Sequence, residues 1–183
     1  MKPIPGVIAI EKSSAAYPAI LRLRLRDSAP LRLTAIGNLD ILGQAKLALF
    51  CSNTCPGCVI LRALELASKL RDENRTVISG FHTPVEKECL AVLLRGKSPI
   101  IICPARSLDR YRIPPVWKSA LAQGRLLLVS PFPQSIRRAT AETARRRNEF
   151  VAALATETLV LHATPGGRLA TSLGHTSLPL TAK

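Results

Sequence analysis

Thiol and polar side chains gather in one short loop that follows an apolar run: Cys51, Ser52, Asn53, Thr54, Cys55, Gly57 and Cys58. Hydroxyl groups, a side-chain amide and a close-lying glycine backbone at the mouth of a helix suit a phosphate group. The C-x3-C-x2-C spacing suits instead a [4Fe–4S] cluster held by thiolates. We favour phosphate binding by Ser52, Asn53 and Gly57. A structural turn with buried thiols, and an iron–sulfur site at Cys51, Cys55 and Cys58, are the alternatives.

A second polar turn follows the apolar residues 76–78. A glycine at Gly80 would allow an unusual φ and the close approach of a ligand. His82 and Glu86 lie one helical turn apart, and such a pair can do acid–base work. The alternative is a helix cap with a solvated glutamate and a structural histidine. We expect Ser79 and Gly80 to contact a ligand, and we assign no catalytic residue beyond His82 and Glu86 as candidates.

Arginines form the densest charge cluster of the chain, and Glu142 is the one acidic residue among them. The cluster consists of Arg137, Arg138, Arg145, Arg146 and Arg147. On a helix, Asn148 falls on an apolar stripe with Val151, and Arg147 borders that stripe. We therefore expect Arg147 and Asn148 to reach a ligand crevice, with Arg137 and Arg138 binding phosphate at its outer surface. The alternative is a solvated basic helix with a satisfied asparagine.

The elements that must position these residues alternate along the chain. The predicted strands are 47–50, 76–79, 99–103, 125–130 and 158–162, and the predicted helices are 58–70, 84–94, 116–122 and 140–155. This alternation predicts an α/β fold, a Rossmann-like three-layer sandwich with a mainly parallel sheet of five or more strands. Ligands of such sheets bind outside the carboxyl ends of the strands. Loops at those ends also hold Arg106, Gly166 and Gly167, which we add to the predicted phosphate contacts.

The pattern divides the chain into three parts. Residues 1–40 form an irregular N-terminal arm on the core, and the alternation of Arg22, Arg24 and Arg26 with leucines indicates a short strand or extended segment there. Residues 41–168 form the Rossmann-like domain. Residues 169–183 form a weakly ordered tail.

Composition narrows the class of partner. The chain has 183 residues, of which 26 are Lys or Arg and 12 are Asp or Glu, so its formal net charge is +14. A strongly basic domain favours a polyanion such as nucleic acid or nucleotide. Only 4% of residues are aromatic, which favours contacts to phosphates over base stacking, and Trp117 is assigned to the core. We expect a cytoplasmic protein without signal peptide, membrane contact or cofactor.

Several short motifs resemble the DNA-processing protein A family, within a wider Rossmann-like group that includes cytokinin-activating proteins. The resembling segments are Tyr17–Leu21, Ala29–Leu31, Ile36–Asn38, Val77–Phe81, Arg125–Phe132 and Arg146–Leu154. The resemblance implies a basic pocket at the sheet's carboxyl edge that binds single-stranded DNA. It carries over to Ser79, Gly80, Arg147 and Asn148 by match, and to Ser52 and Gly57 more loosely. It also implies a homodimer.

The sequence departs from the family at several of these motifs. The family's first loop carries Gly-Ser-Arg, whereas this chain has Cys51-Ser52-Asn53, so an anion-binding arginine is missing there. The cytokinin-activating relatives carry a catalytic glutamate after a Pro-Gly-Gly motif, and this chain stops matching after Gly167. These departures disfavour nucleotide hydrolysis by that mechanism, and a nucleotide-binding or nucleotide-hydrolysing protein of the wider group is the alternative function. Recombinase loading is not carried over.

Overall fold

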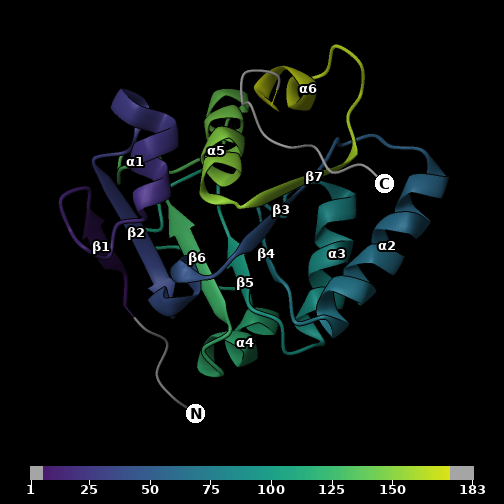
Figure 1. The fold of residues 1–183 in the computed structure, drawn as a ribbon, viewed down its shortest axis with the longest axis horizontal. Helices are drawn as coiled ribbons and strands as arrows, with labels where there is room; N and C mark the ends of the chain where they lie inside the picture. The colour runs from purple at the N-terminus through teal and green to yellow at the C-terminus, as the bar shows by residue number, and fades with distance from the viewer. Residues whose placement is uncertain (1–5, 174–183) are drawn as a thin grey trace.

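A computed structural model describes residues 6–173, which form a seven-stranded sheet flanked by helices (Figure 1). The strands are β1 (Ile8–Glu11), β2 (Arg32–Gly37), β3 (Lys46–Cys51), β4 (Thr76–Ser79), β5 (Ile100–Ile102), β6 (Leu126–Ser130) and β7 (Glu157–His162). The α-helices are α1 (Ala19–Leu25), α2 (Gly57–Asp72), α3 (Pro84–Leu94), α4 (Lys118–Ala122), α5 (Ala141–Leu154) and α6 (Arg168–Leu173). Short 3-10 turns cover Arg26–Ser28, Leu39–Gly43 and Pro115–Trp117.

The strand order is β1-β2-β6-β5-β4-β3-β7. The five strands from β6 to β7 are parallel, while β2 pairs antiparallel with both β6 and β1. Strands β3 to β6 follow one another outward in the sheet, and β7 returns to the far side of β3. The strand order therefore reverses at β3, and the loop after β3 lies where such sheets place their ligands.

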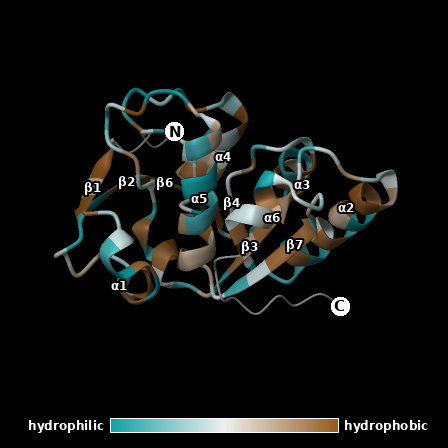
Figure 2. Ribbon diagram, turned by 90° about the horizontal axis from the view of Figure 1, so that it is seen from above, coloured by the Kyte–Doolittle hydropathy of each residue, from teal (hydrophilic) through white to brown (hydrophobic). Residues whose placement is uncertain are grey.

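The sheet is covered on both faces, and this makes the sandwich three layers thick. Along β3, Ala48 and Phe50 belong to a core shared with α5, whereas Leu47 and Leu49 belong to a second core shared with α2 and α3. Successive side chains of a strand point to opposite faces, so a strand covered on both sides must be apolar throughout. Figure 2 shows this as hydrophobic colouring along the central strands. The predicted three-layer, mainly parallel sandwich is confirmed.

The N-terminal region departs from the sequence prediction. Residues predicted as a strand or extended segment form the helix α1 instead, because Leu21 and Leu25 fall four residues apart on the face that packs on α5. Arg24 reinforces this packing by donating to the carbonyl oxygens of Ala152, Ala153 and Ala155 at the end of α5. The sequence pattern of residues 1–40 indicates an irregular arm and does not indicate the strands β1 and β2.

The C-terminal region holds one helix that the sequence did not indicate. Helix α6 covers Arg168–Leu173 and buries Leu169 and Ser172 against the rest of the protein, with its closest packing on α5. The remainder of the predicted tail, residues 174–183, lies outside the described residues.

A pair of leucine substitutions tests whether β2 belongs to the core. Leu33 is fully buried in β2, whereas Leu31, two residues earlier, is 77% exposed. We expect Leu33→Ala to lower the free energy of unfolding by about 2–5 kcal/mol, because it opens a cavity in a packed core. Leu31→Ala should leave it nearly unchanged. Urea unfolding followed by circular dichroism measures both, and equal small effects would show that this strand is peripheral.

Candidate anion-binding crevice

Two cavities open side by side at the carboxyl edge of the parallel strands. The larger has a volume of about 910 Å³ and the smaller of about 420 Å³. Both are lined by His82, Ala105, Ala139 and Arg147, so they meet at these residues. Several predicted phosphate contacts line the larger cavity: Ser52, Asn53, Asn148, Gly166 and Gly167. Two others, Gly80 and Arg106, line the smaller cavity.

Arg147 is the buried centre of this crevice. Its side chain is 5% exposed and projects from α5 toward the ends of β4 and β5. Nη1 donates to the carbonyl oxygen of Cys103 at 3.1 Å, and Nε donates to Oδ1 of Asn148 at 2.8 Å. None of the side-chain hydrogen bonds among residues 6–173 uses Nη2. Nη2 of this buried guanidinium is thus available to a group that enters the crevice.

The helical stripe differs in detail from the prediction. Arg147 is itself a member of the buried face of α5, together with Thr143, Phe150 and Leu154. Asn148, predicted on the stripe, is half-buried at its edge and uses its side-chain oxygen to orient Arg147. Both residues line the larger cavity, and the arginine lies deeper than the asparagine.

Gly80 makes room for Arg147. A Cβ atom placed on Gly80 would lie 1.4 Å from Nη1 and 2.0 Å from Cζ of Arg147. The prediction that Gly80 supplies an unusual φ is wrong, since the positive φ of this turn is at Phe81, with a value of 45°. The group that lies close to the Gly80 backbone is the guanidinium of Arg147.

The charge around Arg147 is not neutralised. Within the described residues no carboxylate lies within ion-pair distance of its guanidinium. Burial lowers the pKa of Arg147, and the more distant Glu86 raises it in part. An arginine keeps its proton even so, because its ordinary pKa lies far above neutrality. A buried cation without an acidic partner is costly, and an entering anion would relieve that cost.

Glu86 holds the loops of the crevice in place. Its Oε1 accepts from the backbone N–H of Cys51 at 3.1 Å, and its Oε2 accepts from those of His82 at 2.9 Å and Thr83 at 3.4 Å. Thr83 in turn accepts from the N–H of Glu86, which completes a capping box at the start of α3. The alternative prediction of a helix cap with a solvated glutamate is wrong about the solvation, because Glu86 is 4% exposed. Its carboxylate ties the end of β3 to the turn after β4.

The two serines that end β4 and β6 serve their own turns. Oγ of Ser79 accepts from the N–H of Phe81 at 3.2 Å, and Oγ of Ser130 accepts from Phe132 while donating to the carbonyl of Arg106. Ser79 is fully buried and lines neither cavity. The structure therefore places Ser79 beneath the crevice and Gly80 at its surface.

The loop after β3 turns its polar residues toward the larger cavity. Oγ of Ser52 accepts from the N–H of Thr164 at 3.0 Å, which fixes the loop to the segment after β7. Asn53 is exposed at the rim. Gly57, predicted to bind with them, is the first residue of α2 and lines neither cavity.

The cysteines of this loop are not gathered as ligands. Cys51 is buried, Cys55 is half-buried and Cys58 is exposed on α2. In the described part of the chain, no group of three or more His, Cys, Asp or Glu side chains could hold a metal ion. The structure therefore does not favour the iron–sulfur alternative.

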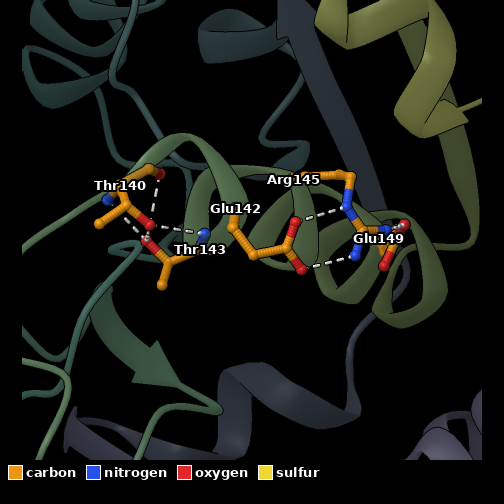
Figure 3. A network of polar contacts seen from close by, with 5 residues as sticks. All are labelled: Thr140, Glu142, Thr143, Arg145 and Glu149. Atoms are coloured by element: carbon orange, nitrogen blue, oxygen red, sulfur yellow. Dashed lines mark hydrogen bonds and ion pairs between the residues drawn. The ribbon is translucent and has the colours of Figure 1, made fainter.

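The other arginines of the cluster have separate positions. Arg145 donates to Glu142 at 2.7 and 3.0 Å and pairs with Glu149, so its charge is compensated (Figure 3). Arg146 lies over the ring of Phe132. Arg137 and Arg138 are exposed in the loop before α5 and line neither cavity. Arg147 alone of the five carries its charge into the buried part of the crevice.

Sequence reasoning missed several residues that the structure brings to the crevice. Thr140 caps α5 by accepting from the N–H of Thr143 at 3.2 Å, and it lines the larger cavity. A threonine directly before a helical pattern is an N-cap signal, which could have placed this helix start at the site. Lys87, Tyr111 and Trp117 line the smaller cavity, and no sequence pattern pointed to them together.

No helix among the described residues is long and apolar enough to cross a bilayer. The sheet, its helical layers and the crevice at its carboxyl edge define a Rossmann-like α/β protein. The chain belongs to the DNA recombination-mediator protein A family, which matches residues 8–173. The resemblance inferred from the short motifs is thus confirmed. A comparison with curated proteins finds no match.

Two solved structures share the fold. The X-ray structure of DNA processing protein A from Streptococcus pneumoniae superposes on this chain with a TM-score of 0.74 at 20% sequence identity. The matched region covers 91% of this chain and 58% of the Streptococcus pneumoniae chain. DNA processing protein A from Helicobacter pylori, whose single-stranded DNA binding mode has been described, gives a TM-score of 0.70 at 20% identity. That match covers 96% of this chain and 80% of the other. This chain therefore spans little more than half the length of the first protein.

Substituting Glu86 tests its structural assignment. Glu86→Gln keeps one oxygen but turns an amide N–H₂ group toward backbone donors. We expect the free energy of unfolding to fall by about 1–3 kcal/mol, because at least one buried N–H loses its acceptor. Chemical denaturation measures the change. The exposed Glu88→Gln on the same helix is the control, and equal stability of the two variants would contradict the assignment.

Thiol labelling tests the arrangement of the cysteines. Burial is the main cause that raises the pKa of Cys51, Cys89 and Cys103 to about 12, and the thiol of Cys55 contributes at Cys51. At pH 8 these buried thiols stay protonated and unreactive. We expect an aromatic disulfide reagent to label the exposed Cys58 first in the native protein, and all five cysteines only after unfolding. Rapid native labelling of Cys103 would contradict the packing at Arg147.

Proposed function

We propose that this protein binds single-stranded DNA by seating a backbone phosphate in the crevice beside Arg147. The observation that carries the proposal is a buried guanidinium with neutral partners, which lines both cavities at the carboxyl edge of the sheet. A phosphate oxygen is the kind of acceptor that arginine binds best, through charge-assisted hydrogen bonds. The free Nη2 would be the donor.

The walls of the larger cavity suit the same ligand. The capped start of α5 lies at the cavity through Thr140 and Ala141, and the positive end of a helix dipole favours an anion. Gly166, Gly167 and the exposed Arg168 also line this cavity. The loop residues Ser52 and Asn53 add neutral polar groups. Phosphate contacts of this kind hold a strand without reading its sequence.

Two further observations support a nucleic acid over a free anion. The formal net charge of +14 is far larger than one phosphate needs, and a basic surface attracts a polyanion over distance. The family is described as a DNA recombination mediator, and the similar protein from Helicobacter pylori binds single-stranded DNA. A catalytic role for Glu86 has no such support, since its carboxylate is occupied by three backbone N–H groups.

An anisotropy titration with a fluorescent oligothymidylate tests the proposal. We expect the logarithm of the affinity to fall linearly with the logarithm of the salt concentration, because binding releases counterions. Arg147→Ala should weaken binding by about tenfold or more, since a charge-assisted hydrogen bond contributes about 1.5–3 kcal/mol. Arg168→Ala, at the exposed rim, should have a smaller effect.

Arg62→Ala is the matched control, because Arg62 is exposed on α2 and lines neither cavity. Arg147→Lys keeps the charge but loses the paired contacts, so it separates charge from geometry. Thermal unfolding of each variant shows that it folds. Absence of binding at low salt, or equal losses in Arg147→Ala and Arg62→Ala, would overturn the proposal.

A further inference from the structure

His82 lies where the two cavities meet, and the proposed phosphate site leaves it without a role. We propose that the His82 imidazole, when protonated, is a second cationic contact to the bound strand, so that the affinity for single-stranded DNA rises as the pH falls. The inference rests on the proposed function and deepens it, because it makes proton concentration a regulator of the same crevice.

The turn after β4 fixes the backbone of His82. Phe81 adopts a φ of 45°, and the next N–H, that of His82, donates to Oε2 of Glu86 at 2.9 Å. The same buried carboxylate accepts from the N–H groups of Cys51 and Thr83. His82 is therefore anchored through its main chain, while its side chain is exposed and lines both cavities.

The imidazole of His82 has no partner within residues 6–173. None of the side-chain hydrogen bonds or ion pairs of this range uses one of its ring nitrogens. A protonated imidazole offers two N–H donors. Because His82 and Arg147 line the same junction, an anion that binds Nη2 of Arg147 enters the space that His82 also borders.

The groups around His82 leave it without an acidic partner. Neither Glu86 nor Glu142, the two carboxylates that line the cavities, forms an ion pair with the imidazole. Glu86 is bound to backbone N–H groups, and Glu142 pairs with Arg145. A strand would bring the missing anion. The ionisable groups that line the cavities with His82 are Cys51, Glu86, Lys87, Arg106, Tyr111, Glu142, Arg145, Arg147 and Arg168.

A histidine at this place makes binding and protonation depend on each other. The ordinary pKa of histidine, about 6.5, places its change of charge between pH 5 and 8. An imidazolium donates charge-assisted hydrogen bonds to a phosphate, and neutral imidazole does not. A strand that favours the protonated form takes up protons on binding, so its affinity falls as the pH rises through this range. Arg147 stays charged throughout, so the pH dependence reports on His82 alone of the two.

Anisotropy titrations at pH 5.5 and pH 7.5, at one ionic strength, test the proposal. The probe is a fluorescent oligothymidylate without a terminal phosphate, because a phosphate monoester itself titrates near pH 6. We expect binding about tenfold tighter at the lower pH, since hydrogen bonds to charged groups contribute on that scale.

Three variants assign the pH dependence to one histidine. His82→Gln keeps a hydrogen-bonding side chain without the charge, so it should bind at both pH values as weakly as the original protein does at pH 7.5. His82→Lys carries a permanent charge and should bind at pH 7.5 about as tightly as the original protein does at pH 5.5. The matched control is His162→Gln combined with His175→Gln, which leaves His82 as the one histidine of the chain and should keep the full pH dependence. His162 is half-buried in β7 and lines neither cavity.

Calorimetry gives a second readout that a purely structural role of His82 would not change. Titrations in buffers of different ionisation enthalpy count the protons taken up when the oligothymidylate binds. We expect proton uptake near pH 6.5 in the original protein and in the control, and almost none in His82→Gln. Thermal unfolding of each variant shows that it folds.

The outcomes separate this inference from the proposed function. Equal affinity at the two pH values without proton uptake would overturn the His82 contact and leave the phosphate site at Arg147 standing. A pH dependence that persists in His82→Gln would also overturn it. Failure of the strand to bind at either pH, at low salt, would overturn both proposals together.

Discussion

The contact between the Arg147 guanidinium and the turn at Gly80 sets the geometry of the whole carboxyl edge. The side chain leaves α5, passes over Gly80, which has no Cβ, and donates to the carbonyl of Cys103 at the end of β5. A helix on one face of the sheet is thereby joined to two adjacent strand ends. The two cavities meet at this side chain, so its position decides their shapes.

Neutral partners keep that guanidinium available. Asn148 and Cys103 orient it through oxygens that carry no charge, while the nearby carboxylate of Glu86 is bound to backbone N–H groups. Arg145 shows the contrast on the same helix, because two glutamates compensate it at the surface. Burial without compensation makes Arg147 costly in the empty protein and favourable toward an anion. The large positive net charge would then act at longer range and guide a strand to the crevice.

The sequence predicted the fold well where the spacing of apolar residues and the residue types both indicated the same element. Apolar runs ending in Ser79 and Ser130 could be placed as buried parallel strands, and the Arg147–Asn148 pair could be placed at their edge. The prediction failed at Leu21–Leu25, because leucines at alternate positions satisfy a strand pattern while tertiary packing on α5 selects the helix. The prediction also failed to pair Tyr111 with Trp117 or Gly80 with Arg147. Such contacts depend on the path of irregular loops, and the spacing of apolar residues does not indicate that path.

The most direct measurement of the central claim is the affinity of Gly80→Ala for single-stranded DNA. This substitution leaves the charge of the chain unchanged and alters only the space in which the Arg147 side chain lies. The account predicts a loss of binding close to that of removing the guanidinium, by about tenfold or more, while the protein remains folded by circular dichroism. Binding as tight as that of the original protein would contradict it.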